Sequence, residues 1–321
     1  MRKILLPLLL TIFLLAGCSK VPDTEVAHNP VIGFSQSGTE SSWRKAHTKS
    51  IKSELKKGDY EVLYRNAFMN QEQQLQDVRT FISYKVDLII IAPLQESGWD
   101  SVLRAAKRAH IPVIIVDRHI DTADQTLFLT HIGPSFKAEG NRAGLYATNY
   151  FADKRIDSIN ILELVGLSGT SPSKLRHDGF LETISCDHRM KISSTLVGNY
   201  TRNKAYDVVN DYLHSPKSKP FNLLYSHSDE MTLGALTALK ENHIKPGHDV
   251  VIITIDGQEN IIKKLSQGEV NCVVECNPDV GWYVVNAINR HFSGHQLAHE
   301  IYISETTFSE SNINKIPTRN Y

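Results

Sequence analysis

The sequence predicts an α/β protein with two lobes, each formed by a parallel β-sheet covered by helices on both faces. Short β-branched runs alternate with segments of helical periodicity along most of the chain, and this alternation is typical of parallel sheets. More than eight such runs are present, which exceeds one doubly wound sheet, and 321 residues with 41% hydrophobic content are sufficient for two domains. A closed (β/α)8 barrel is the competing architecture.

The first half of the chain contains four predicted strands, at residues 31–34, 61–64, 87–92 and 113–116. The segments between them have helical periodicity, since Leu75, Val78 and Ile82 share one helix face. The alternation resumes after Phe136, with predicted strands at 158–164, 192–197, 223–225, 250–255 and from 271 onward. We therefore divide the two lobes near residues 131–134.

The charge balance argues against a nucleic-acid partner. Lys and Arg total 35 and Asp and Glu total 35, so the formal net charge is zero. A protein that binds nucleic acid by neutralising phosphates normally has a concentrated basic excess. We expect no nucleic-acid binding.

The first 18 residues predict a signal peptide that is not part of the fold. Arg2 and Lys3 precede an apolar stretch at 4–15, which is too short to span a bilayer as a mature helix. The ending Leu15-Ala16-Gly17-Cys18 resembles the bacterial lipobox, in which the cysteine is lipidated; a plain secretory signal is the alternative. The sequence thus predicts an exported protein held at a membrane by lipidated Cys18, with a tether at 19–30.

Three cysteines remain after the signal peptide: Cys186, Cys272 and Cys276. An odd number cannot all pair within the chain. Cys272 and Cys276 lie in one predicted strand, where positions four apart are about 13 Å from each other, beyond disulfide reach. We expect three free thiols, mostly buried.

Open parallel sheets bind ligands beyond the carboxyl ends of their strands, and the first of these ends is rich in polar groups. Residues 35–44 combine serines, Gln36, Glu40 and Arg44 with a single indole, Trp43. This combination suits a polyhydroxylated ring, whose apolar face stacks on indole while its hydroxyls are hydrogen-bonded. The alternative interpretation, that Glu40 and the adjacent serines cap the next helix, is compatible with the first.

Two more strand ends offer carboxylates. Asp117 and Arg118 directly follow a predicted strand. The Asp117 carboxylate is an acceptor and the Arg118 guanidinium has five N–H donors, a pair that suits vicinal hydroxyls. A structural ion pair is the alternative. Asp256 ends an apolar strand and precedes a glycine, whereas Asp229 can also serve to complement the next helix N-terminus. Arg176 lies near the start of a helix, where it can face the cleft.

Motifs for catalysis or metal binding are absent from the sequence. It contains no HExxH, no metal-type cysteine pairs, no P-loop ending and no Gly-x-Gly-x-x-Gly. His291, His295 and His299 are spaced by four, but Gly294 interrupts a helix there, which favours a solvated turn. We expect no enzyme activity, no cofactor and no metal.

These strand ends together resemble those of one family. The matching segments are Phe34-Ser35-Gln36, Glu40-Ser41, Trp43-Arg44, Val116-Asp117-Arg118, His227-x-Asp229-x-Met231 and Ile255-Asp256-Gly257. In order and spacing they resemble the sugar-binding type I periplasmic binding proteins, and within that family the galactofuranose-binding group. Ser228 departs from the asparagine that is usual there, and Cys276 stands near a position where many members have a cleft glutamine.

The resemblance implies two Rossmann-like lobes joined by a three-crossover hinge, with one monosaccharide in the cleft. It implies an N-terminal lobe of 31–132 and 277–296 and a C-terminal lobe of 133–276 and 297–321. The implied ligand-binding residues are Gln36, Glu40, Trp43, Arg44, Asp117, Arg118, Glu139, Arg176, Asp229 and Asp256.

The function implied is that of a lipid-anchored, monomeric protein that delivers a galactofuranose-like sugar to an ABC permease. A sugar receptor that engages a sensor kinase or a chemoreceptor is the alternative, because both would use the same cleft. An exported glycosidase is disfavoured, because the arginines beside the candidate carboxylates would lower their pKa and make them poor general acids.

Overall fold

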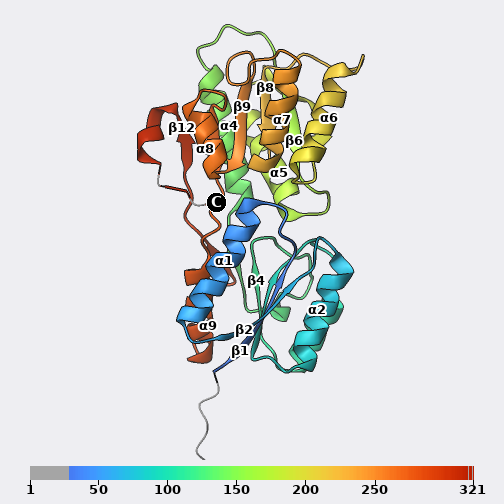
Figure 1. Cartoon of the computed structure of the whole chain (residues 1–321), viewed down its shortest axis with the longest axis vertical. Helices are drawn as coiled ribbons and strands as arrows, with labels where there is room; N and C mark the ends of the chain where they lie inside the picture. The colour runs from blue at the N-terminus through green and yellow to red at the C-terminus, as the bar shows by residue number, and fades with distance from the viewer. Residues whose placement is uncertain (1–28, 317, 320) are drawn as a thin grey trace, which may run out of the picture.

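The computed structural model describes residues 29–316, 318–319 and 321 and divides the strands between two six-stranded sheets (Figure 1). The first sheet is parallel throughout. Its order is β11 (Glu300–Tyr302), β5 (Thr130–Gly133), β4 (Val113–Val116), β3 (Leu88–Ala92), β1 (Val31–Gln36) and β2 (Glu61–Asn66).

The second sheet repeats this arrangement position by position. Its order is β12 (Thr307–Ser309), β10 (Cys272–Glu275), β9 (Val251–Asp256), β8 (Leu223–Ser226), β6 (Ile159–Val165) and β7 (Met190–Val197). Only β12 runs antiparallel to its neighbour. The two sheets confirm the two-lobe prediction and exclude the closed barrel. All nine predicted strands are present, whereas β5, β11 and β12 were not predicted.

Helices cover both faces of each sheet, because the buried strands are apolar on both sides. In the first lobe, α1 (Ser42–Lys57) and α9 (Gly281–Phe292) cover one face, and α2 (Gln71–Ser83) and α3 (Asp100–Arg108) cover the other. In the second lobe, α4 (Phe136–Phe151) and α5 (Ser171–Ile184) lie opposite α6 (Arg202–His214), α7 (Asp229–Glu241) and α8 (Glu259–Ser266).

The chain crosses between the lobes three times: between β5 and α4, between β10 and α9, and between β11 and β12. The predicted position of the third crossing was wrong. Residues 300–302 pair with β5 in the first sheet, so the chain returns to the second lobe only after Tyr302, not at 297. Three residues are too short a strand for a sequence pattern, and a neighbouring strand decides the pairing.

Two further predictions concern the N-terminus and the cysteines. Cys18 and most of the predicted tether lie outside the described residues, so the structure does not bear on lipidation. In the described part of the chain, every helix is too short or too polar to cross a bilayer. All three described cysteines are free, and Cys272 and Cys276 are buried as predicted, but Cys186 is exposed.

Candidate functional site

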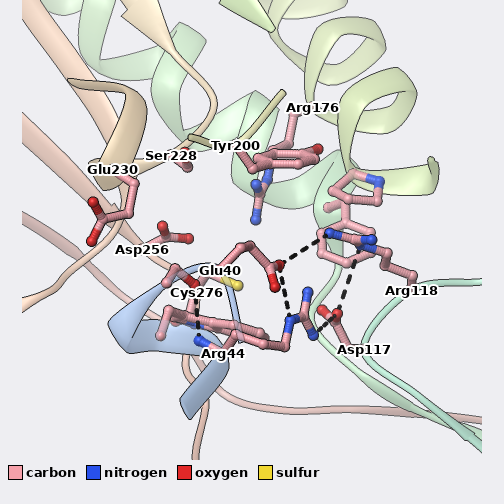
Figure 2. A pocket seen from close by; sticks show the side chains of 14 residues that line it. Glu40, Arg44, Asp117, Arg118, Arg176, Tyr200, Ser228, Glu230, Asp256 and Cys276 are labelled. Atoms are coloured by element: carbon pink, nitrogen blue, oxygen red, sulfur yellow. Dashed lines mark hydrogen bonds and ion pairs between the residues drawn. The ribbon is translucent and has the colours of Figure 1, made fainter. Parts of the chain in front are cut away.

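A small cavity lies between the two lobes, where the carboxyl ends of both sheets face each other (Figure 2). Both lobes contribute to its wall. The lining residues are Glu40, Ser41, Trp43, Arg44, Asp117 and Arg118 from the first lobe, and Phe136, Pro172, Arg176, Tyr200, Ser228, Glu230, Asp256 and Cys276 from the second.

The start of α1 brings Trp43 and Arg44 into this wall. Ser41 is the N-cap, and its hydroxyl accepts a hydrogen bond from the Arg44 backbone N–H at 3.0 Å, so the first helical turn begins at the cavity. The Trp43 indole is 5% exposed, and its Nε1–H donates to the Cys276 carbonyl of the opposite lobe at 2.6 Å. Trp43 therefore lines the cavity and also joins the lobes.

Four charged side chains of the first lobe form one buried network. Arg44 donates from Nη1 to Asp117 Oδ2 at 2.5 Å and from Nε to Glu40 Oε1 at 3.3 Å. Arg118 lies 3.9 Å from both Glu40 and Asp117. Burial alone would raise the pKa of Asp117, but the charges of Arg44 and Arg118 outweigh burial and lower it to about 2. Asp117 is consequently an ionised acceptor at neutral pH.

Two polar atoms of this network have no hydrogen-bond partner among the described residues: Glu40 Oε2 and Arg118 Nε. Buried polar atoms are normally hydrogen-bonded, so unpaired ones at a cavity wall indicate groups that a ligand satisfies. Arg118 is held in place by a hydrogen bond from Nη1 to the Leu94 carbonyl at 3.1 Å, and its guanidinium lies over the Tyr200 ring at 5.4 Å. The fork is thus fixed before any ligand arrives.

The two aspartates that face the cavity occupy equivalent positions, Asp117 after β4 and Asp256 at the end of β9. Both have a positive φ, 65° for Asp117 and 127° for Asp256, which non-glycine residues seldom adopt. Such strain is typical of functional sites. Gly133 packs against the Asp117 backbone so closely that a Cβ there would lie 2.9 Å from the Asp117 carbonyl oxygen.

Arg176 is the corresponding cation of the second lobe. Its Nε donates to Glu139 Oε2 and its Nη1 to the His227 carbonyl, each at 2.6 Å. Glu139 is fully buried and is not part of the cavity wall, so it orients Arg176 from behind. The guanidinium also lies 5.2 Å from the Phe136 ring centre.

Asp256 and Asp229 form a buried acidic pair. Asp229 accepts hydrogen bonds from the backbone N–H groups of Gly257 and Gln258, at 2.8 and 2.7 Å, and from the Thr254 hydroxyl at 2.8 Å. Burial raises the pKa of Asp229 to about 7, and these donors offset only part of that effect. Burial, and then the charge of Asp229, raise the pKa of Asp256 well above its ordinary value. Asp256 therefore holds the proton of the pair.

Seven of the ten predicted binding residues line the cavity, and three do not. Gln36 is buried below it, where its amide donates to Thr48 Oγ1 at 2.9 Å. Asp229 uses its carboxylate to shape the turn after β9, and Glu139 supports Arg176. All three contact the chain instead of the cavity: donors of the chain bond to Gln36 Oε1, to both Asp229 oxygens and to Glu139 Oε2.

The sequence analysis missed several wall residues, among them Tyr200, Phe136, Pro172 and Glu230. Glu230 stands beside the predicted site residue Asp229, in the first turn of α7. Tyr200 lies in the polar segment 198–204 that follows β7, a strand end that the sequence analysis did not consider, and its ring lies beside Arg118. The signal that could have found it is its position just beyond the carboxyl end of a parallel strand.

The chemistry of the wall suits a small neutral molecule with several hydroxyl groups. The arginine guanidinium groups supply bidentate donors, the carboxylates supply acceptors, and the indole supplies an apolar surface. Two groups with potential metal-ligand atoms exist in the described chain, His119–His131–Glu300 and Glu139–Cys276–Glu305, and only Cys276 of these residues lines the cavity.

Comparisons with known proteins agree with this geometry. A family model described as a periplasmic binding protein domain matches residues 32–296. The chain is 34% identical over 277 residues to the galactofuranose-binding protein YtfQ of Escherichia coli K12, with 86% of each chain covered. It is 30% identical over 296 residues to the fructose import binding protein FruE of Bifidobacterium longum, covering 91% of this chain and 88% of that protein.

Solved structures share the fold. The periplasmic binding component of an arabinose ABC transporter from Shewanella sp. ANA-3, bound to α- and β-L-arabinofuranose, is 36% identical with a TM-score of 0.84, covering 89% of this chain and 93% of that chain. A galactofuranose-binding protein is 33% identical with a TM-score of 0.85, covering 89% of this chain and 96% of that chain.

Proposed function

This chain belongs to the periplasmic binding protein family, and on that premise we propose that it captures a galactofuranose-like monosaccharide between its lobes and delivers it to an ABC permease. The binding residues in this proposal are Glu40, Trp43, Arg44, Asp117, Arg118, Arg176 and Asp256. Gln36, Glu139 and Asp229 act by holding these residues in position. The family consists of substrate-binding proteins, and the chain is not an enzyme.

One observation supports the proposal most strongly: each lobe presents an aspartate and an arginine to the same small cavity. Asp117 and Arg118 come from the first lobe, and Asp256 and Arg176 from the second. A monosaccharide has hydroxyls around its whole circumference, so it can pair with both sets at once and bridge the lobes.

We propose that the bound monosaccharide is in its furanose ring form. The relatives with the higher identities include a galactofuranose-binding protein and a protein bound to arabinofuranose. Ser228 lines the cavity with a side chain shorter than the asparagine usual in the resembling family, and this difference bears on which furanose fits. We further propose that the protein is located in the periplasm and is anchored to a membrane by lipidated Cys18.

Calorimetry and thermal unfolding of the purified protein against free sugars test this function. We expect a melting-temperature rise with a furanose-forming sugar, and an Arg118→Lys variant that folds normally but loses most of the affinity, because lysine has no planar fork. Arg79→Lys, an exposed arginine outside the cavity, is the control and should bind normally. Normal binding by Arg118→Lys would remove Arg118 from the site, and no binding of any monosaccharide would refute the function.

Two further experiments address anchoring and delivery. Detergent-phase partitioning of the expressed protein should be lost in Cys18→Ser, and equal partitioning would contradict lipidation. Deletion of the gene should abolish uptake of the bound sugar. If uptake persists and a transcriptional response to the sugar is lost instead, the sugar-receptor alternative is correct.

A further inference from the structure

Outside the cavity, three side chains with metal-ligand atoms converge at the hinge edge of the first sheet. His119 follows the cavity residue Arg118, His131 lies on β5, and Glu300 lies on β11. One ligand atom from each residue lies within 4.8 Å of the other two. We propose that these three residues, here the hinge cluster, bind a divalent transition-metal ion of the Zn²⁺ type.

The surroundings of His131 are the first argument. Its Nε2 lies 2.8 Å from the Asp117 carbonyl oxygen and its Nδ1 lies 2.8 Å from Glu300 Oε2, with 1% of the side chain exposed. A neutral imidazole has one N–H and can donate to only one of these acceptors. If Nε2–H donates to the carbonyl, the Nδ1 lone pair faces a carboxylate oxygen, and a cation between the two removes this repulsion.

This arrangement is also the usual one for a metal-ligating histidine. Such a residue normally donates its second N–H to a carbonyl or carboxylate, which fixes the tautomer and the ring orientation. The Asp117 carbonyl supplies that acceptor here. His131 therefore has its supporting hydrogen bond in place and its other nitrogen directed at the cluster.

His119 points one ring nitrogen at Glu300 Oε2, the oxygen that His131 also contacts. Its Nε2 lies 3.4 Å from Glu300 Oε2, and its ring stacks on His131 with centroids 3.8 Å apart. The Nδ1 atom of His119 is buried without a partner among the described residues. About a quarter of the His119 side chain and a third of the Glu300 side chain are exposed, so an ion and a water can reach the cluster.

The donor set selects the ion. Two imidazole nitrogens and one carboxylate oxygen form a three-residue zinc set that leaves the fourth position to water, whereas Mg²⁺ and Ca²⁺ prefer oxygen ligands throughout. Bond lengths of about 2.1 Å in a tetrahedron place ligand atoms about 3.4 Å apart. The spacings to Glu300 Oε2 are 2.8 and 3.4 Å, so a modest opening of the ring stack accommodates the ion.

A metal here would join three strands at the hinge. It would link the end of β4 to β5 and β11, and the last two strands lead directly into crossovers. The His119 backbone N–H also donates to Ser171 Oγ of the second lobe at 2.9 Å. The ion would therefore stabilise the folded protein at the point where the lobes are connected.

Titration of the untagged, metal-free protein with ZnCl2 tests the proposal. We expect one equivalent to bind by calorimetry, with a melting-temperature rise that EDTA reverses. Co²⁺ should give the visible absorption bands of a tetrahedral site. His119→Ala and Glu300→Gln should each weaken Zn²⁺ binding at least about tenfold. His295→Ala, an exposed histidine outside the cluster, is the control and should leave binding unchanged.

The outcomes separate metal binding from a purely ionic contact. His119→Ala removes a partly exposed ring, and its circular dichroism and sugar binding establish that it folds. If wild type and His119→Ala bind Zn²⁺ equally, or if His295→Ala abolishes binding, the proposal is overturned. The cluster would then be a hydrogen-bonded contact between the two histidines and Glu300 and not a metal site.

Discussion

At the scale of single residues, the cavity is built from side chains whose orientations are fixed before a ligand binds. Arg44 is paired with Asp117 in the first lobe and Arg176 with Glu139 in the second, so both pairs persist when the lobes separate. Prior fixation reduces the entropy lost on binding, so each hydrogen bond to a ligand contributes more to affinity. Trp43 has two roles in this arrangement, as an apolar surface and as an interlobe contact.

Substitution of Trp43 separates these two roles. Trp43→Phe keeps an aromatic ring and loses the hydrogen bond to the Cys276 carbonyl, so we expect affinity for the cognate sugar to fall about tenfold. Trp43→Ala also removes the apolar surface and should cost about 2 kcal/mol or more. Trp282→Ala, which removes an exposed indole on α9, is the control for calorimetry. Unchanged affinity in Trp43→Ala would exclude Trp43 from the site.

The pH dependence of stability tests the acidic pair. The raised pKa of Asp256 means that the folded state binds this proton more tightly than the unfolded state, whose pKa is about 3.9. The resulting stability is present below pH 4 and is lost as the pH rises towards the folded pKa, by at most about 1.4 kcal/mol per pH unit. Asp256→Asn cannot ionise, so its stability relative to wild type should increase between pH 5 and pH 8.

Chemical denaturation at several pH values measures this difference. Asp211→Asn, at an exposed position on α6, is the control and should show no such trend. A difference between wild type and Asp256→Asn that is constant from pH 5 to pH 8 would mean that Asp256 does not hold the proton in this range.

At the scale of elements, the two lobes repeat one design. The strands have the same spatial order, and β4 and β9, the third strands of their sheets, both end at a cavity aspartate. The helices are brought close to one another by small residues. Gly140 of α4 packs against the α5 backbone at Arg176, and this contact decides where the Arg176 guanidinium lies.

Gly140→Ala tests that contact. An alanine Cβ would lie 2.2 Å from the Arg176 carbonyl oxygen and 2.8 Å from the Phe180 nitrogen, so α4 and α5 would have to separate. Alanine normally gains about 1 kcal/mol over glycine within a helix, but overpacking costs about 1–3 kcal/mol and should dominate. We expect a lower urea midpoint together with weaker sugar binding, because Arg176 is displaced.

The control lies on the same helix. Leu145 is 55% exposed, and Leu145→Ala should change stability by less than about 0.5 kcal/mol. If Gly140→Ala is as stable as wild type, α4 and α5 are not packed as tightly as the structure indicates.

At the scale of the whole molecule, the described structure is a closed form. On one side of the cleft Ser42 contacts Gln258 and Trp43 contacts Cys276. On the other side the Glu96 backbone N–H donates to the Gly169 carbonyl at 3.1 Å. Contacts on both rims hold the lobes together around the cavity, and we expect these contacts to break when the lobes separate about the three crossovers to admit a ligand.

Small-angle scattering tests this opening. The free protein should sample open forms, and the cognate sugar should reduce the radius of gyration by stabilising the closed form. At a hundredfold excess over its dissociation constant the sugar should also add about 2.7 kcal/mol of stability. Asp117→Ala and Asp256→Ala each remove one lobe's acceptor, and the contraction should be lost in both. Tight binding without any change in the radius of gyration would contradict a closing cleft.

Within residues 29–316, 318–319 and 321, the sequence alone determined the fold class, nine of the twelve strands and seven of the fourteen residues around the cavity. These features are local: alternation, helical periodicity and polar clusters at strand ends are visible in short windows of sequence. Tertiary structure decided the rest. The short β11 joins the first sheet only because β5 lies beside it, and Tyr200 reaches the cavity only because β7 and its turn bring it to Arg118.

Tertiary structure also decided the hinge cluster, and it decided which polar side chains point into the cavity and which bond to the chain itself. His119, His131 and Glu300 are far apart in sequence and have no motif spacing, yet three adjacent strands place them together. Asp229 has the sequence context of a ligand residue, but three donors of the chain itself occupy its carboxylate. Competition between chain and ligand for the same oxygen depends on distances of a few ångströms, and only the folded chain sets those distances.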